Sequence, residues 1–341
     1  MTESHDLERA LFAVKQVVVG QDRMVERLLV AALARGHCLL EGVPGVAKTL
    51  AAQTLATVLG GTFSRIQFTP DLVPSDIVGT RIYRPSSEDF TVEYGPVLAN
   101  VVLADEINRA PAKVQSALLE VMSERQVSVG GLTTPAPAPF LVLATQNPIE
   151  SEGVYRLPEA QRDRFLFHIA VGHPTEAEEL AILYRMGVEA PVPPQVLDPE
   201  TVTRMQAEAS RVFVHNAIAE YVVRLVAATR APMRHGLPDL VGRIAVGASS
   251  RATLGLVAAA RGLALLRGRE YVVPRDVQDL AGDVIAHRLV LTFEALAEDV
   301  APRALVDRVL AVVPPPRVVP SDEPESGPGP GPEAAGQGWA A

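Results

Sequence analysis

Short strand-like segments alternate with amphipathic segments along the first half of the chain. Strand-like segments cover residues 37–40, 63–68, 97–104, 140–145 and 165–171, and most of them are continuously apolar. Between them, apolar residues at helical spacing cover residues 22–34, 48–59 and the stretch after Pro111. Strands without polar alternation are typical of a parallel sheet buried on both faces. The pattern therefore predicts an α/β fold with a parallel sheet between helical layers over residues 1–172.

Two segments interrupt this alternation, and a different pattern follows it. Residues 79–94 and 125–140 each have short β-type runs on either side of polar or glycine-rich residues, which predicts two hairpin insertions. From residue 173 onward only helical patterns occur, including about 217–230, 251–267, 275–289 and 302–313, which predicts an all-α domain at residues 173–313. Residues 314–341 are rich in Pro, Gly and Glu, and we expect them to be disordered.

Composition narrows the possible environments and partners. The chain has 341 residues, 48% of them hydrophobic, yet no run of about 18 apolar residues that predicts a membrane span. The polar, acidic start lacks the pattern of a signal peptide, and the single cysteine, Cys38, excludes an internal disulfide, so we expect a cytoplasmic protein. The formal net charge is −9 and no Lys/Arg run occurs, which argues against nucleic acid as a partner.

The segment Gly42-Val-Pro-Gly-Val-Ala-Lys48-Thr49 lies where a predicted strand leads into a helix. Glycines there let backbone N–H groups converge on phosphate oxygens, and the helix N-terminus favours negative charge. The alternative, a glycine-rich helix cap followed by a chance Lys-Thr, fits the flanking strand and helix less well. The residues predicted to bind nucleotide are Gly42, Val43, Pro44, Gly45, Val46, Ala47, Lys48, Thr49 and Leu50.

One position departs from the usual P-loop pattern. Ala47 stands where a glycine usually precedes the lysine, and we expect its methyl group to be tolerated if the residue keeps a helical φ. Farther upstream, Gly20 and Gln21 precede the first long helix, and we place them beside the adenine.

The run Val101-Val-Leu-Ala-Asp105-Glu106 delivers two carboxylates to the end of an apolar strand. Ligands of open α/β sheets bind at this edge. Asp105 and the Thr49 hydroxyl are therefore predicted to hold Mg²⁺, and Glu106 is predicted to act as the general base for the attacking water. The alternative is a helix cap formed by Asp105 or Asn108.

Three further polar side chains are candidates for ATP cleavage. Asn147 ends the apolar run that begins at Phe140, and its amide is predicted to contact the γ-phosphate, although an Asn-Pro turn would explain it too. Arginines 162 and 164 precede the last strand, and one of them is a candidate for an arginine donated across a subunit boundary, against the alternative of a salt bridge with Asp163. Arg251 starts a helix, so it needs an anionic partner, either a phosphate or a carboxylate of its own domain.

Taken together, five motifs resemble those of the MoxR family of AAA+ ATPases, in the magnesium-chelatase and helix-2-insert groups. The resemblance covers about residues 7–312, and its motifs begin at Gly42, Arg65, Asp105, Ala144 and Leu157. It implies an AAA+ αβα core with a helical lid, with alanine common at position 47. It also implies that the hairpins are the helix-2 insert and the pre-sensor-1 hairpin.

The resemblance also assigns roles to individual residues. It implies that Asn147 is sensor 1, Arg164 the arginine finger and Arg251 sensor 2. Arg162 replaces a usual leucine and so competes with Arg164 for the finger role, and Ser250 replaces the usual proline before sensor 2.

Members of this family are chaperone-like motors, so the resemblance implies ATP and Mg²⁺ as ligands and a ring of identical subunits, six in most members. It further implies a partner with a von Willebrand factor A (VWA) domain and client proteins that the motor remodels. A DNA-translocating ATPase and a scaffold that binds ATP without hydrolysing it are the alternatives. Acids at the first hairpin tip argue against DNA, and Glu106, Asn147 and Arg164 argue against the scaffold.

Overall fold

The computed structural model describes residues 2–86, 88–148, 155, 157–187 and 191–316. Its centre is a five-stranded parallel sheet with the strand order β2-β5-β8-β1-β9. The strands are β1 (Cys38–Glu41), β2 (Phe63–Gln67), β5 (Val101–Asp105), β8 (Leu141–Gln146) and β9 (Phe167–Ala170). The predicted parallel α/β sheet is therefore confirmed.

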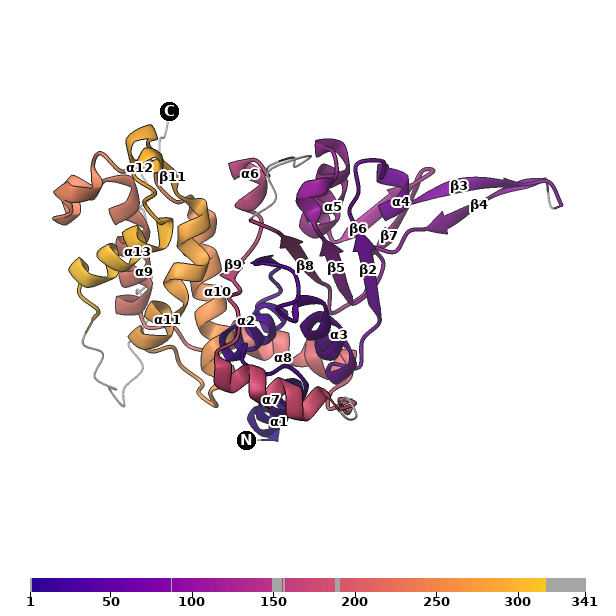
Figure 1. Ribbon diagram of the computed structural model, residues 1–341, viewed down its shortest axis with the longest axis horizontal. Helices are drawn as coiled ribbons and strands as arrows, with labels where there is room; N and C mark the ends of the chain where they lie inside the picture. Colours follow the sequence, from indigo (N-terminus) through magenta and orange to yellow (C-terminus); the bar gives the residue numbers. More distant parts are fainter. Residues whose placement is uncertain (1, 87, 149–154, 156, 188–190, 317–341) are drawn as a thin grey trace, which may run out of the picture.

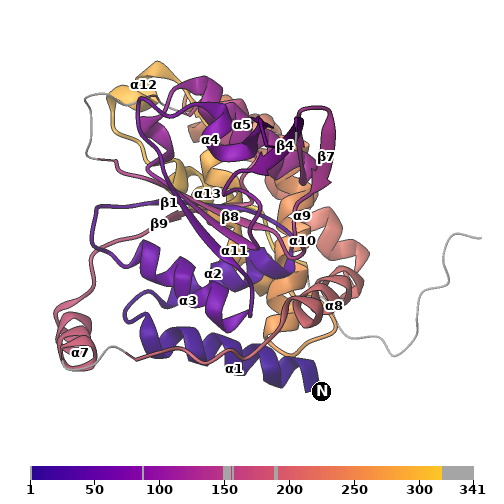
Figure 2. The same ribbon diagram turned by 90° about the vertical axis from the view of Figure 1, so that its right-hand side faces the viewer.

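The sheet separates two hydrophobic layers (Figure 2). Helices α1 (Thr2–Val17), α2 (Asp22–Leu33) and α3 (Lys48–Val58) cover one face, and α4 (Pro74–Val78) and α5 (Ala112–Glu124) cover the other. Strand β1 shows the division, because Cys38 and Leu40 pack into the first layer while Leu39 packs into the second. Burial on both faces explains why the central strands are continuously apolar.

Strand register brings the ends of four neighbouring strands together. Cα pairing aligns Gln67 with Asp105 and Glu41 with Gln146, at the carboxyl edge of the sheet. The turn from β1 into α3 begins at the same edge, directly after Glu41. Side chains from β1, β2, β5 and β8 therefore converge where an α/β sheet binds its ligands.

Two antiparallel hairpins extend from the α/β core. The first pairs β3 (Gly79–Arg84) with β4 (Asp89–Tyr94) and projects away from the body in Figure 1. The second pairs β6 (Gln126–Val129) with β7 (Leu132–Pro135). A hydrogen bond of 2.5 Å between the hydroxyls of Tyr94 and Thr134 joins the two hairpins.

Two helices that follow β9 pack back on the core. Arg185 of α7 (Glu176–Met186) donates to the carbonyls of Lys15 and Gln16 at the end of α1. Gln206 of α8 (Pro199–Arg211) donates to the carbonyl of Ala32 in α2, 2.7 Å away. The domain limits at residues 172 and 313 stay predictions, and most of the predicted tail, 314–341, lies outside the described residues.

A helical lid lies on the left-hand side of the molecule in Figure 1, opposite the hairpins. Its helices are α9 (Asn216–Arg230), α10 (Ser250–Leu266), α11 (Pro274–Ile285), α12 (Phe293–Ala297) and α13 (Pro302–Val312). A short antiparallel pair, β10 (Ile244–Val246) with β11 (Val290–Leu291), adds to the predicted helices. None of the helices in the described part of the chain is long and apolar enough to cross a membrane.

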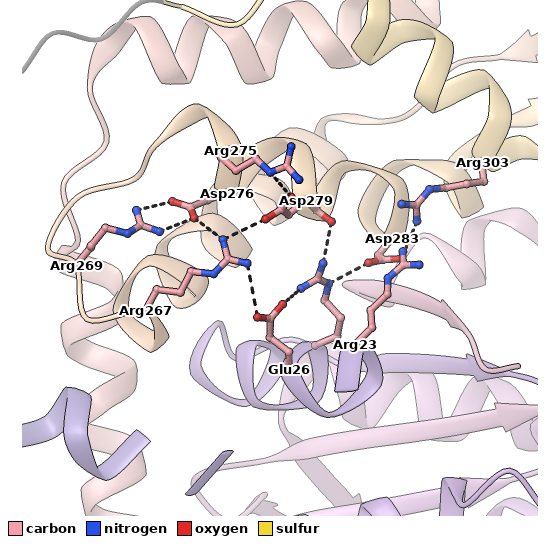
Figure 3. A network of polar contacts seen from close by, with 10 residues as sticks. Arg23, Glu26, Arg267, Arg269, Arg275, Asp276, Asp279, Asp283 and Arg303 are labelled. Atoms are coloured by element: carbon pink, nitrogen blue, oxygen red, sulfur yellow. Dashed lines mark hydrogen bonds and ion pairs between the residues drawn. The ribbon is translucent and has the colours of Figure 1, made fainter. Parts of the chain in front are cut away.

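A network of ion pairs joins the lid to the core helix α2 (Figure 3). Asp283 of α11 accepts from Arg27 of α2 and from Arg303 of α13, each at 3.0 Å, and also pairs with Arg23. Arg267, beyond α10, connects Glu26 of α2 to the acids of α11. Since α2 and α10 also share one hydrophobic cluster, apolar and ionic contacts both hold the lid against the core.

The buried imidazole of His37 makes stability sensitive to acid. Its Nδ1 accepts from the Val142 N–H at 3.0 Å and its Nε2 donates to the Met122 carbonyl at 3.2 Å, so the ring is neutral. Burial lowers the pKa of His37 to about 4. In the unfolded chain the same group has a pKa of about 6.5, so between these values only the unfolded state binds the proton.

Acidification is therefore expected to destabilise the protein through His37. Stability should fall as pH drops below about 6.5, and this residue alone contributes about 2 kcal/mol between pH 7 and pH 5. Urea unfolding at the two pH values measures the loss. A His37→Gln variant should show a smaller difference between pH 7 and pH 5 than the parent, and an equal difference in both proteins would contradict the assignment to His37.

Candidate nucleotide site

The turn from β1 to α3 has the geometry of a phosphate cradle. Gly45 has a φ of 86°, and no atom lies within 4 Å of the position that a Cβ would take there. A Cβ on Gly42 would lie 2.4 Å from the carbonyl oxygen of Val171, so only glycine fits at that position. Helix α3 starts without a side-chain cap or an acidic residue in its first turn, which leaves its N–H groups available to an anion.

Ala47 differs from the sequence-based expectation. Its φ of 64° is left-handed, so the condition under which the methyl group is expected to be tolerated, a helical φ, is not met. The loop turns into α3 at this residue, and a left-handed alanine costs about 1 kcal/mol. Glu106 has a φ of 57° and is likewise left-handed. Two strained residues thus lie in the same candidate site, as is common for functional sites.

Lys48 shares its surroundings with three carboxylates. Its ammonium group donates to the carbonyl of Gly42 within the cradle. Burial lowers the pKa of Lys48, while the negative charges of Asp105, Glu106 and Glu41 act in the opposite direction. The predicted phosphate-binding lysine and the two predicted catalytic acids therefore lie within electrostatic reach of one another.

Thr145 joins the two acids. Its buried hydroxyl donates to Oδ1 of Asp105 at 2.6 Å and accepts from the backbone N–H of Glu106 at 2.8 Å. The two carboxylates differ in their other partners, so they have different surroundings although they are adjacent in sequence. Thr145 was not singled out from the sequence, although it lies two residues before Asn147 in the same motif.

Strand β2 supplies two contacts that the sequence pattern does not predict. Arg65 donates to Oδ2 of Asp105 from Nη2 at 2.7 Å and from Nε at 3.1 Å. Gln67 donates to Oε2 of Glu106 at 2.9 Å, and Nε of Arg109 lies 2.9 Å from the same oxygen. Each acid is thus held by an arginine in this structure.

Glu41 is another acid that the sequence pattern does not single out. It directly precedes the cradle, and its Oε2 lies 2.6 Å from Nε2 of His168 on β9. That hydrogen bond is the largest influence that lowers the pKa of Glu41, and Gln146 and Arg162 also lower it. Asn147, the predicted sensor 1, follows β8 directly after Gln146 and is buried.

Gly20 and Gln21 lie close to the segment that follows β9. The side-chain amide of Gln21 donates to the carbonyl of Gly172 at 3.0 Å, and a Cβ on Gly20 would meet the Glu178 side chain. Gly172 follows Val171, whose backbone packs against the cradle at Gly42. The predicted adenine-side residues are therefore connected to the cradle through residues 171 and 172.

The two candidate arginine fingers lie in different surroundings. Nη1 of Arg164 donates to the Leu119 carbonyl at 2.8 Å and to the Ser123 hydroxyl at 2.7 Å, both on α5. Arg162 ends α6 (Glu159–Arg162) and lies near enough to Glu41 of its own subunit to lower the pKa of that carboxyl. Among the described residues, neither arginine forms the alternative salt bridge with Asp163, since Arg162 pairs with Glu159 and Arg164 donates to α5.

Asp163 instead receives groups from the lid. Its carboxylate accepts from Ser249 at 3.0 Å, from Arg251 at 3.2 Å and from Nε of Arg288 at 2.9 Å. Arg251 therefore has a carboxylate partner, but on the segment before β9 rather than in the lid. Burial lowers the pKa of Arg288 to about 10, so this cation stays charged at neutral pH.

The available ligands fit a magnesium ion bound together with a nucleotide. The described residues contain no cluster of three or more His, Cys, Asp or Glu side chains suited to a metal ion. Magnesium bound to nucleotides commonly keeps several water ligands and uses only one or two carboxylates with the phosphates. Asp105 beside the hydroxyl-bearing start of α3 meets that requirement.

Comparisons with known proteins agree with this geometry. Residues 37–167 match the family model "ATPase family associated with various cellular activities (AAA)", and residues 242–326 match "AAA lid domain". The chain is 62% identical over 316 residues to Chaperone MoxR1 of Mycobacterium tuberculosis, which covers 93% of this chain and 84% of the relative. It is 36% identical to Protein MoxR of Paracoccus denitrificans, over 89% of this chain and 94% of that protein.

One solved structure extends the similarity to the whole fold. A crystal structure of a provisionally assigned ATPase from Cytophaga hutchinsonii has a TM-score of 0.87 and 42% sequence identity. The match covers 93% of this chain and 96% of that one. Core and lid therefore share the arrangement of a solved relative.

Proposed function

Because this chain belongs to the MoxR family of AAA+ ATPases, we propose that it hydrolyses Mg²⁺-bound ATP at the site formed by residues 42–50, Asp105 and Glu106. The main support is the position of Lys48, whose pKa responds to both acids at the end of β5. A cradle for phosphates, the Lys48 ammonium group and two carboxylates are then present in one place. These are the components that phosphoryl transfer to water requires.

Each residue of the proposed site has a separate role in binding or cleaving ATP. Lys48 exchanges its contact with the Gly42 carbonyl for the β- and γ-phosphates, and the uncapped N–H groups of α3 donate to phosphate oxygens. Thr49 and Asp105 hold the metal, which neutralises phosphate charge when bound. Glu106 accepts a proton from the attacking water, and Asn147 orients that water beside the γ-phosphate. Gly20 and Gln21 flank the adenine.

Two arginines complete the site in an assembly. Arg164 is proposed to reach the γ-phosphate of a neighbouring subunit, and Arg251 to serve as sensor 2. Both have partners that phosphate oxygens can replace, since Arg164 donates to two neutral oxygens and Arg251 is half-exposed beside Asp163. This division requires a ring of identical subunits, and we propose six.

The proposed biological role is that of a chaperone-like motor. The relative with 62% identity is named Chaperone MoxR1, which supports the same role for this chain. We extend the proposal to a VWA-domain partner and to client proteins that the motor remodels. Capture of client and partner on a Glu106→Gln variant held in its ATP-bound state tests this extension against a Lys48→Ala variant, which is expected to bind nucleotide more weakly.

Nucleotide binding itself is tested by removal of Lys48. We expect Lys48→Ala to raise the Kd for Mg·ATP by about 10- to 100-fold, because hydrogen bonds to charged groups contribute ~1.5–3 kcal/mol. Isothermal titration with ATP and Mg²⁺ measures the change. Lys113→Ala, which removes an exposed lysine of α5, is the matched control and should bind like the parent. Equal affinities for all three proteins would contradict the proposed cradle.

A further inference from the structure

Arg65 occupies the carboxylate that is proposed to hold the metal. Its guanidinium reaches from the edge strand β2 and donates twice to Oδ2 of Asp105, at 2.7 and 3.1 Å. Thr145 donates to the other oxygen, Oδ1, at 2.6 Å. Both oxygens of Asp105 are therefore hydrogen-bonded before any metal is present.

The two cations have conflicting requirements at Asp105. A guanidinium is always charged and only donates, so it competes with a metal ion for the same oxygen rather than assisting it. Magnesium in turn demands near-octahedral coordination and retains water ligands that need acceptors. Like charges at a shared carboxylate also repel each other. The hydrogen bonds of Arg65 to Oδ2 and the binding of the hydrated ion at the same oxygen therefore weaken each other.

The ion pair between Arg65 and Asp105 is weak enough for Mg²⁺ to displace Arg65. The Arg65 side chain is 51% exposed, so water screens its ion pair with Asp105. Exposed pairs of this kind contribute at most ~1 kcal/mol, which corresponds to about fivefold in an equilibrium constant. A contact of that strength raises the Mg²⁺ concentration needed to occupy Asp105. It is still weak enough for Mg²⁺ to displace Arg65.

We propose that Arg65 competes with Mg²⁺ for Asp105 and so sets the magnesium concentration at which the nucleotide site fills. This role rests on the proposed function, because it requires that Mg·nucleotide binds at Asp105. Arg65 is then a residue that tunes metal affinity and does not touch the reacting atoms. Any change that moves β2 away from β5 would release Asp105 and favour metal binding.

Nucleotide binding at controlled magnesium concentrations tests the competition without any hydrolysis. The probe is the β,γ-imido analogue of ATP with an N-methylanthraniloyl label, titrated by fluorescence at a series of free Mg²⁺ concentrations and in EDTA. In Arg65→Met the Mg²⁺ concentration at half-maximal tightening should fall about fivefold. Arg65→Lys, which keeps the charge but loses the planar fork, should fall between Arg65→Met and the parent.

Two further proteins separate competition from other effects. Arg9→Met removes an exposed arginine from a pair with Asp6 on α1, far from Asp105 in sequence, and should leave the Mg²⁺ midpoint unchanged. In an Asp105→Asn background the Arg65→Met substitution should no longer shift the midpoint, since the contested carboxylate is gone. Thermal unfolding of each variant establishes that it is folded before titration.

The outcomes distinguish this inference from the proposed function. A higher Mg²⁺ midpoint in Arg65→Met, or an unchanged one, would overturn the competition. A loss of affinity that is equal in EDTA and at every Mg²⁺ concentration would also overturn it, because Arg65 would then only attract phosphate. If the parent protein showed no magnesium-dependent affinity for the analogue, the proposed function itself would fail.

Discussion

Glu106→Gln is expected to lower the rate of ATP hydrolysis by about 10²- to 10⁴-fold, the usual contribution of a positioned general base. Glutamine keeps the size of the side chain and can still contact Gln67 and Arg109, which hold Glu106 in the structure. It cannot take a proton from the attacking water at neutral pH. Phosphate release at saturating Mg·ATP measures the rate, and equilibrium binding of ATP should change little.

The control for this substitution is Glu8→Gln, which alters an exposed glutamate of α1. It should hydrolyse ATP at the parent rate. A lower rate in Glu106→Gln alone would then be due to the site and not to the loss of one negative charge. Turnover by Glu106→Gln at the parent rate would remove the base assignment. If the variant lost both ATP binding and ATP hydrolysis, Glu106 would instead be needed to shape the cradle.

Asp283→Ala is expected to lower the free energy of unfolding by about 3–5 kcal/mol, because it breaks a buried ion pair and removes one of the two carboxylates that neutralise the buried Arg27. The Asp283 carboxylate is almost fully buried and accepts from Arg27, which is itself buried, and from Arg303 (Figure 3). Arg27 would keep only Glu26 and the Asp279 carbonyl as partners. Urea unfolding followed by circular dichroism measures the loss.

An exposed pair of the lid provides the comparison for Asp283. Arg308 and Asp239 form a single ion pair at 2.8 Å, and both side chains are about half exposed. Because water screens this exposed pair, Asp239→Ala should lower the free energy of unfolding much less than Asp283→Ala does. Equal costs for the two substitutions would show that burial of the Asp283 network does not stabilise the contact between lid and core.

Several site residues were recognisable because their signals are local. The cradle at residues 42–49 has glycines between a strand and a helix, and Asp105 and Glu106 directly follow an apolar strand. Lys48 does lie within electrostatic reach of both acids. Their assigned roles stay predictions, as do those of Asn147, Arg164 and Arg251.

Several contacts of the site had no local signal. One of the five family motifs begins at Arg65, but the contacts of Arg65 and Gln67 with the acids exist only because β2 pairs with β5, some 40 residues later. The partner of Arg251 is 88 residues away in sequence, at Asp163. The left-handed φ of Ala47 depends on how the cradle joins α3, which residue type alone predicts poorly.

The sequence by itself determined the parallel α/β core, the helical lid and the glycine-containing turn between β1 and α3, because apolar periodicity and glycine placement act over a few residues. Only the tertiary structure decided the strand order, the arginines that hold the two acids and the network that joins α2 to α11. These contacts depend on which apolar faces pack together across long stretches of chain, and no short pattern encodes that choice.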